Sequence, residues 1–164
     1  HGKRNIVLVR GPAQHEDAYW REEAYKLALQ SHGLPFRKEL VLSGEFERDI
    51  AYASMREFLA DSPTFDALFA SDDDSALGAL KALNESGRRV PEDIALVGFN
   101  DINLSSFVTP PLTTVHAPTE QVGRVAAQQL FRILENETPD LVTLLPTQVI
   151  LRRSCGCAYI PDNL

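Results

Sequence analysis

Long apolar runs are missing from this 164-residue sequence. The run Ile6-Val-Leu-Val9 is typical, and it is far shorter than the roughly 20 residues that a membrane-spanning helix requires. Cysteine is also scarce, because Cys155 and Cys157 are the only two in the chain. One intervening residue is poor spacing for a mutual disulfide, and two thiolates do not complete a metal site. We therefore expect free thiols, no metal, no membrane association and a reducing, cytoplasmic setting.

Positive charge is in deficit as well. The chain has 16 Lys and Arg against 23 Asp and Glu, which gives a net charge of −7. Binding to nucleic-acid phosphates needs clustered Lys and Arg. This segment is therefore not expected to bind nucleic acid by itself, although the composition leaves room for a basic module in a longer parent protein.

The common motifs of catalysis are absent. The sequence contains no G-x-x-x-x-G-K-[ST], no G-x-G-x-x-G, no G-x-S-x-G and no H-E-x-x-H. A phospho-receiver site would need acids directly after the first strand and a late lysine. Asp17 lies too far past Val9, and no lysine follows Lys81. We therefore expect no catalytic residues, no enzymatic activity and no cofactor.

The sequence does contain short apolar runs that alternate with amphipathic helical stretches. Alternation of this kind with short connections requires right-handed crossovers and a parallel sheet covered by helices. The expected strands cover residues 5–10, 37–42, 67–70, 94–99 and about 147–152, and the helical stripes are Trp20/Ala24/Leu27/Ala28/Ser31, Ala51/Met55/Phe58/Leu59, Ala76/Leu80/Leu83 and, in a helix over about 119–134, Val122/Ala126/Leu130/Ile133. The pattern predicts an α/β fold with a doubly wound parallel sheet.

Ligands of open α/β sheets bind outside the carboxyl ends of the strands. The loops at those ends are expected at residues 11–17, 43–46, 71–74 and 100–107, and Arg21 follows one turn into the first helix. Topology alone therefore brings their polar and aromatic side chains to one border of the sheet. These residues are His15, Asp17, Phe46, the three aspartates Asp72, Asp73 and Asp74, and Asn100.

Several segments in a fixed order carry a family resemblance that covers nearly the whole chain. They are Gly11-Pro12 with Arg21-Glu-Glu-Ala-Tyr25, Ser43-Gly-Glu-Phe46, Phe69-Ala-Ser-Asp-Asp-Asp-Ser-Ala-Leu-Gly78, Val90-Pro-Glu-Asp-Ile-Ala-Leu-Val-Gly-Phe-Asn-Asp101, Pro110-Pro-Leu-Thr-Thr-Val115 and Arg152-Arg-Ser154. Each segment alone is weakly specific, but together and in register they are specific. The sequence resembles the effector-binding domain of the lactose/galactose repressor (LacI/GalR) family, a relative of periplasmic sugar-binding proteins, and mostly its C-terminal lobe.

The resemblance implies a periplasmic-binding-protein-like lobe of type I. In that family two lobes clamp a small molecule, usually a sugar, nucleobase or nucleoside, and a helix-turn-helix headpiece binds operator DNA. By this comparison, residues 1–117 would form the C-terminal lobe, 118–145 a helix that packs on the N-terminal lobe, and 146–164 the returning strand and tail. The headpiece and most of the first lobe would lie outside this chain.

The resemblance also implies roles for Arg21 and Asn100. Arg21 matches the family arginine that binds ligand hydroxyls, since its guanidinium offers five fixed donors. From the residues alone, an exposed arginine paired with Glu22 or Glu23 is the alternative. Asn100 stands where most members carry an aspartate, so an uncharged amide replaces the usual acceptor and a standard hexose is put in doubt. A turn-forming asparagine is the alternative there.

Four further residues match ligand-contacting positions of the family. Asp72 does so, although aspartates at the start of a helix also cap its N–H groups, which is the stronger general explanation, and a metal role is disfavoured. Phe46 matches an aromatic that lies beside the ligand, with a core phenylalanine as the alternative. His15 and Asp17 lie in the first loop, where solvated loop residues are the simpler interpretation.

These features lead to one preferred function and several alternatives. We expect the effector-binding lobe of a LacI/GalR-type transcriptional regulator, with a sugar-like or nucleoside-like small molecule as its ligand. Operator DNA would be bound only through the headpiece outside this chain. The alternatives are a sensor module fused to a diguanylate cyclase or kinase domain, and a periplasmic sugar-binding protein. The apolar stripe of helix 119–134 would lack its home lobe here, so we also expect a homodimer.

Overall fold

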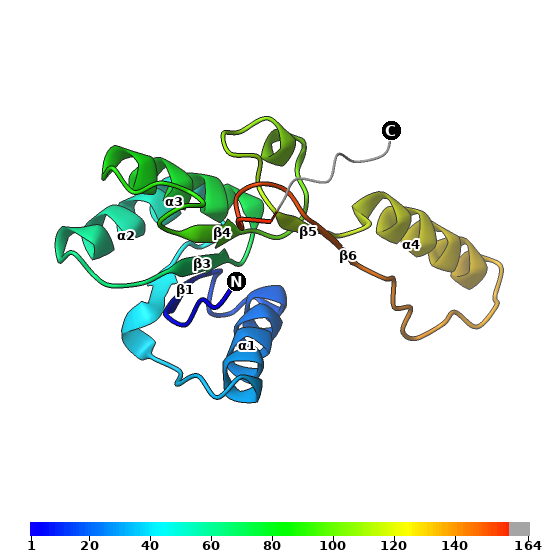
Figure 1. Cartoon of the computed structure of the whole chain (residues 1–164). Helices are drawn as coiled ribbons and strands as arrows, with labels where there is room; N and C mark the ends of the chain where they lie inside the picture. The colour runs from blue at the N-terminus through cyan, green and yellow to red at the C-terminus, as the bar shows by residue number, and fades with distance from the viewer. Residues whose placement is uncertain (158–164) are drawn as a thin grey trace.

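A four-stranded parallel sheet forms the centre of the computed structural model, which describes residues 1–157 (Figure 1). In chain order the strands are β1 (Ile6–Arg10), β2 (Val41–Ser43), β3 (Ala67–Ala70) and β4 (Ala95–Val97). They lie side by side in the order β2-β1-β3-β4, and all three pairings are parallel. The predicted α/β class and parallel sheet are therefore confirmed.

Helices cover both faces of this sheet, as Figure 1 shows. They are α1 (Glu16–Ser31) on one face, and α2 (Arg48–Ala60) and α3 (Asp73–Glu85) on the other. β1 lies between two strands and two helical layers, so Val7, Leu8 and Val9 are all fully buried. Val7 and Val9 pack with α2 and α3, whereas Leu8 packs with α1. The alternation of side chains along a strand thus divides the core into two parts.

The buried face of α1 differs from the predicted stripe. Trp20 and Leu27 are 60% and 66% exposed, whereas Tyr25 and Leu29 are buried. The prediction followed the largest apolar side chains, but a second row at helical spacing faces the sheet. Tyr25 favours this row because its hydroxyl donates a hydrogen bond to the carbonyl of Ile6 at 2.8 Å, which satisfies the polar tip of a buried ring.

The predicted elements are present, but several of their boundaries differ from the prediction. The second strand was predicted at 37–42, but Lys38–Leu40 form a 3-10 turn and β2 begins at Val41. The stripes of α2 and α3 face the core as expected. The fourth and last strands are shorter than predicted, at Ala95–Val97 and Gln148–Ile150, and isolated parallel bridges join Val97 to Thr113 and Asn100 to His116.

A two-stranded antiparallel ribbon follows the main sheet. It pairs β5 (Thr114–His116) with β6 (Gln148–Ile150) and carries α4 (Thr119–Leu134) between them. α4 has the bounds predicted from the sequence, but it buries none of its residues. In Figure 1 this helix projects away from the sheet and its three covering helices. Its apolar side therefore has no partner within the described chain.

Ser154 fixes the chain as it returns to the main sheet. Its hydroxyl donates to the carbonyl of Leu96 at 2.6 Å and accepts from the N–H of Thr113 at 2.8 Å. The N–H of Leu96 in turn donates to the carbonyl of Ser154. The segment after β6 is thus tied to β4. Residues 158–164 of the predicted tail lie outside the described residues.

Within residues 1–157, no helix combines the length and the apolarity that crossing a membrane requires.

Candidate functional site

Arg21 lies at the carboxyl border of the sheet, where α1 leans over the ends of β1 and β3. Its Nη1 donates to the carbonyl of Ser71 at 2.8 Å, and its guanidinium carbon lies 4.1 Å from the centre of the Phe99 ring. The ring of Phe46 is 5.4 Å away on another side. Two aromatic rings and one carbonyl therefore hold the guanidinium in a fixed orientation.

The surroundings of Arg21 also tune its electrostatics. Burial lowers the pKa of its guanidinium, while the carboxylates of Asp17 and Asp72 act in the opposite direction. Asp17 lies 3.4 Å from Nη2, one helical turn earlier in α1. Arginine stays protonated in proteins, so the group remains a cation. Of its five N–H donors, Ser71 and Asp17 engage two among the described residues, which leaves donors available for a further acceptor.

Phe46 reaches this border through an unusual backbone. Glu45 and Phe46 both have positive φ, at 53° and 58°, in the turn between β2 and α2. The Phe46 ring occupies the space above Gly11, where any Cβ would collide with it. The His15 ring packs against Phe46 edge-on, with centroids 5.3 Å apart. Strained turns of this kind cluster at binding sites, and this one places an aromatic face at the end of the sheet.

Asp72 is the N-cap of α3, as the capping interpretation predicted. Its Oδ1 accepts a hydrogen bond from the N–H of Ser75 at 3.0 Å. The side chain is buried, and this burial raises the pKa of its carboxyl above the usual range, against the effect of the Ser75 hydrogen bond. The cap uses one carboxylate oxygen. The carboxylate retains acceptor capacity beside Arg21.

Asn100 lies at the same border but lines a separate hollow. Its backbone has a φ of 114°, and its N–H donates to the carbonyl of Val115 at 2.9 Å. The hollow, of about 680 Å³, lies between the loop after β4 and the start of α4 and is lined by Asn100, Asp101, Asn103, His116, Ala117, Pro118, Thr119, Glu120, Gln121, Arg124, Val125 and Gln128. The amide of Asn100 is therefore placed where the main sheet meets the ribbon that leads to α4.

Asp101, the residue after Asn100, belongs to a structural network. Its Oδ1 accepts from Arg152 at 2.7 Å, and its Oδ2 lies 3.1 Å from Nδ1 of His116. Arg152 is buried and also donates to the carbonyl of Leu112. Arg152 belongs to the sequence motif Arg152-Arg-Ser154, which by itself indicates no role for this side chain. The structure shows that it joins the loop after β4 to the returning chain.

Asp73 is a second residue whose position sequence analysis did not resolve. It is fully buried, and its oxygens accept from Ser105 Oγ, Thr114 Oγ1 and the N–H of Ile102 at 2.7, 2.6 and 3.0 Å. A run of three aspartates gave no sign of which one points inward. These bonds hold the loop 102–105 and β5 against the start of α3.

The structure brings most of the predicted site residues together, but it places Asn100 at a separate hollow. Arg21 lies close to Phe46, Asp17 and Asp72, and His15 packs on Phe46. Phe99, which the sequence had assigned to a strand, also contacts Arg21. Asn100 follows Phe99 directly and faces the neighbouring hollow. A fixed cation, carboxylates and aromatic faces suit a small ligand with hydroxyls on one side and an apolar ring face on the other.

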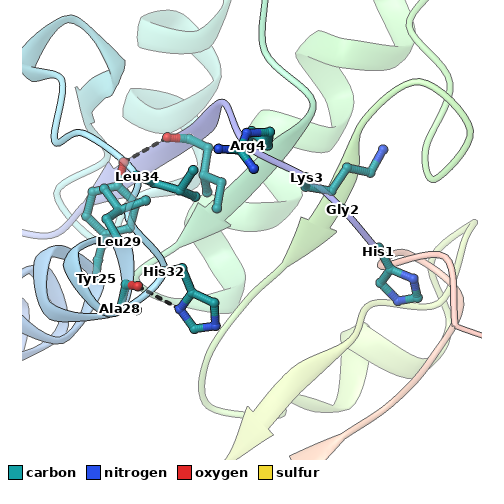
Figure 2. Close-up of a pocket in the computed structure, with 10 residues that line it drawn as sticks. His1, Gly2, Lys3, Arg4, Tyr25, Ala28, Leu29, His32 and Leu34 are labelled. Atoms are coloured by element: carbon teal, nitrogen blue, oxygen red, sulfur yellow. Dashed lines mark hydrogen bonds between the residues drawn. The ribbon is translucent and has the colours of Figure 1, made fainter.

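A further cavity of about 520 Å³ lies at the opposite end of β1, beside α1 (Figure 2). Its floor is apolar, and basic groups line one side. The lining residues are His1, Gly2, Lys3, Arg4, Ile6, Tyr25, Ala28, Leu29, His32 and Leu34. None of the predicted ligand-binding residues lies there. The amino border of a parallel sheet is not where such folds bind ligands, so this cavity is not the candidate site.

A family model described as a periplasmic binding protein-like domain matches residues 1–155. The chain belongs to this family. Its mainly parallel sheet with covering helices is the periplasmic binding protein-like fold that the sequence predicted.

Similar proteins of this family are transcriptional regulators. The HTH-type transcriptional regulator CelR of Thermobifida fusca is 40% identical over 154 residues, which is 93% of this chain and 45% of that protein. A solved complex of the regulator CelR with cellobiose matches with a TM-score of 0.87 at 38% identity, over 93% of this chain and 47% of that one. A LacI family transcriptional regulator from Mycobacterium smegmatis matches with a TM-score of 0.84 at 31% identity, over 93% and 58%.

These comparisons confirm the resemblance to LacI-type effector-binding domains. They also set its extent, because the chain spans about half the length of the curated relatives it matches.

Proposed function

We propose that this chain is the effector-binding lobe of a LacI-type transcriptional regulator, and that the cluster around Arg21 binds a small polyhydroxylated ligand. The observation that carries the proposal is the guanidinium of Arg21, which lies 4.1 Å from the centre of the Phe99 ring and 5.4 Å from that of Phe46, near the carboxylates of Asp17 and Asp72. A sugar ring presents vicinal hydroxyls at its edge and C–H groups on its face. This cluster offers donors and acceptors for the hydroxyls and aromatic rings for the face.

One of the similar solved structures is a complex with the disaccharide cellobiose. We extend this chemistry to the present chain as a sugar-like or nucleoside-like ligand. Asn100 adds an amide at the adjoining hollow, where it can both donate and accept. His15 would limit the ligand on the side of the first loop, since it packs on Phe46 at the rim.

The domain boundaries predicted from the sequence support a two-lobed mechanism. The buried residues of the main core lie between Val7 and Leu112, within the proposed lobe 1–117, whereas α4, within the proposed segment 118–145, has no buried residue and projects from the sheet. In this proposal α4 packs on an N-terminal lobe supplied elsewhere in the parent protein. Ligand bridges the two lobes, and its tighter binding to the closed form shifts the population toward closure.

Regulation of DNA binding completes the proposal. The net charge of −7 gives this chain no electrostatic grip on DNA, so an operator would be bound by a separate headpiece of the parent protein. A cytoplasmic location and a homodimer follow for a regulator that binds a palindromic operator. No catalytic role is assigned to the cluster.

Isothermal titration with cellobiose, a monosaccharide and a nucleoside tests the ligand proposal. We expect the chain to bind one of these classes weakly, since one lobe covers only part of a ligand. Arg21→Gln should reduce the affinity roughly tenfold or more, because it removes a charged donor from a partly buried site. Arg37→Gln is the matched control, since Arg37 is exposed and pairs with Asn5 at the other end of the sheet. Equal loss in both variants, or unchanged binding in Arg21→Gln, would reject the assignment.

A further inference from the structure

The two cysteines lie next to a histidine from the opposite end of the sequence. Nε2 of His1 is 3.1 Å from Sγ of Cys157, and the donor atoms of His1, Cys155 and Cys157 all lie within 4.8 Å of one another. In the part of the chain that the structure describes, this is the one group of three or more metal-ligating side chains at such distances. His1 is labelled in Figure 2, where it lies beside the red ribbon of the chain near its C-terminal end.

We propose that His1, Cys155 and Cys157 form a binding site for Zn²⁺. One imidazole and two thiolates are soft and borderline ligands that zinc prefers, and the cluster contains no carboxylate that would favour Mg²⁺ or Ca²⁺. In a tetrahedral zinc site with these ligands, the donor atoms lie about 3.6–3.8 Å apart. The three donor atoms lie within 4.8 Å of one another, which is near this spacing, and the exposed His1 ring is free of surrounding packing that would prevent its adjustment.

The backbone conformation at Gly156 allows the sulfurs of Cys155 and Cys157 to lie within 4.8 Å of each other. Gly156 has a φ of +88°, a conformation that other residues rarely adopt, and its N–H donates to the carbonyl of Arg153. This hydrogen bond closes a turn over residues 153–156, which contains Cys155 and ends one residue before Cys157. A sequence spacing that disfavours a mutual disulfide therefore still allows both thiolates to face a single ion.

A hydrogen bond from a neighbouring hydroxyl fixes the position of the Cys155 sulfur. The hydroxyl of Thr113 donates to Sγ of the buried Cys155 at 3.1 Å, and its own oxygen accepts from the N–H of Arg152 at 2.8 Å. Outer-shell donors of this kind orient metal ligands and stabilise their charge. Cys157 and His1 are more exposed, which leaves the fourth coordination position to water on the open side.

Bound zinc would join the segment before β1 to the turn after β6. Ser154 and Arg152 already anchor that turn to β4 and to the loop after it. The ion would therefore lock two segments that are 156 residues apart in sequence, at a place away from the Arg21 cluster. Since the donors belong to folded segments, metal binding should raise the midpoint of thermal unfolding.

Metal titration of the reduced, metal-free protein tests the proposal, with Co²⁺ as a spectroscopic probe and Zn²⁺ as the competitor. We expect one Co²⁺ per chain, with thiolate charge-transfer absorption and tetrahedral d–d bands, and full displacement by Zn²⁺. Cys157→Ser should abolish the thiolate-rich spectrum, and His1→Gln should weaken Zn²⁺ binding roughly tenfold or more. Both residues are at least partly exposed, so these variants should keep the fold, which circular dichroism checks.

His32→Gln is the matched control, because this histidine lines the nearby cavity but is not part of the cluster. It should bind Zn²⁺ like the parent protein. Any of three results would overturn the proposal: no Zn²⁺ binding by the reduced protein, Zn²⁺ binding that persists unchanged in Cys157→Ser, or equal affinities of His1→Gln and His32→Gln.

Discussion

Asp73 shows how a single side chain organises the region between the two halves of the chain. Its buried carboxylate gathers two hydroxyls and one N–H from the loop 102–105 and from β5. Charged groups of this kind are tolerated inside a protein because hydrogen bonds satisfy them. Asp73 thereby positions the start of the ribbon that leads to α4, next to the residues proposed to bind ligand.

Replacing Asp73 tests this structural role. Asp73→Ala leaves two buried hydroxyls and one partly buried N–H without their acceptor, so we expect the free energy of unfolding to fall by roughly 3 kcal/mol or more. Urea unfolding followed by circular dichroism measures this change. Asp74→Ala is the control, since Asp74 is partly exposed and forms a surface pair with Arg48, and it should cost less than about 1 kcal/mol. Similar losses for the two variants would contradict the role given to Asp73.

Residue types and strand ends together were enough to place most of the candidate site. Arg21, Phe46 and Asp72 were predicted at one border because parallel strands bring their following loops to the same edge. Phe99 was missed because an aromatic at the end of an apolar run is indistinguishable from a core residue in sequence. The sequence did not indicate His1 as a candidate metal ligand, because Cys155 and Cys157 lie at the far end of the chain and only folding brings the three together.

At the scale of elements, apolar periodicity predicted which helices and strands form better than it predicted which face of each helix is buried. The bounds of α4 and the buried faces of α2 and α3 follow directly from their apolar spacing. α1 carries two apolar rows, and its packing against β1 selects the row with Tyr25 rather than the one with Trp20. Short strands shift by a few residues because tertiary pairing, and not local propensity, sets where each ladder ends.

The exposed stripe of α4 leads to a prediction about association. Val122, Leu130 and Ile133 are all more than half exposed, and an amphipathic helix of this length is marginal without a packing partner. We therefore expect the chain to form dimers above its 18.2 kDa monomer mass, which light scattering measures. The double change Leu130→Glu and Ile133→Glu should shift the population to monomers.

Phe107→Glu provides the control for this experiment. Phe107 is 81% exposed and does not line the hollow beside the start of α4, so its replacement should leave the dimer unchanged. A monodisperse monomer of the parent chain at high concentration would contradict the prediction. Dissociation by Phe107→Glu alone would place the interface elsewhere.

At the scale of the whole molecule, the chain consists of a lobe built on the helix-covered sheet and an arm that projects from it, and in the proposed function this arm contacts a second lobe. The lobe has a complete two-sided core, and its carboxyl border carries the Arg21 cluster. The arm consists of the β5–β6 ribbon and α4, which projects from the lobe in Figure 1. The parallel-sheet fold is the one expected for the family that the chain matches. The identity of the ligand is not set by this fold but by the side chains of the Arg21 cluster.

Mapping of ligand contacts by nuclear magnetic resonance tests the central claim most directly. Cellobiose, a monosaccharide and a nucleoside would be titrated into the isotope-labelled chain, and the shifted amide signals assigned to residues. The account predicts shifts concentrated in residues 11–21, 44–47, 71–74 and 98–101, at the carboxyl border of the sheet. Shifts that centre instead on the cavity between the amino end of β1 and α1, or no shift with any of the three compounds, would contradict it.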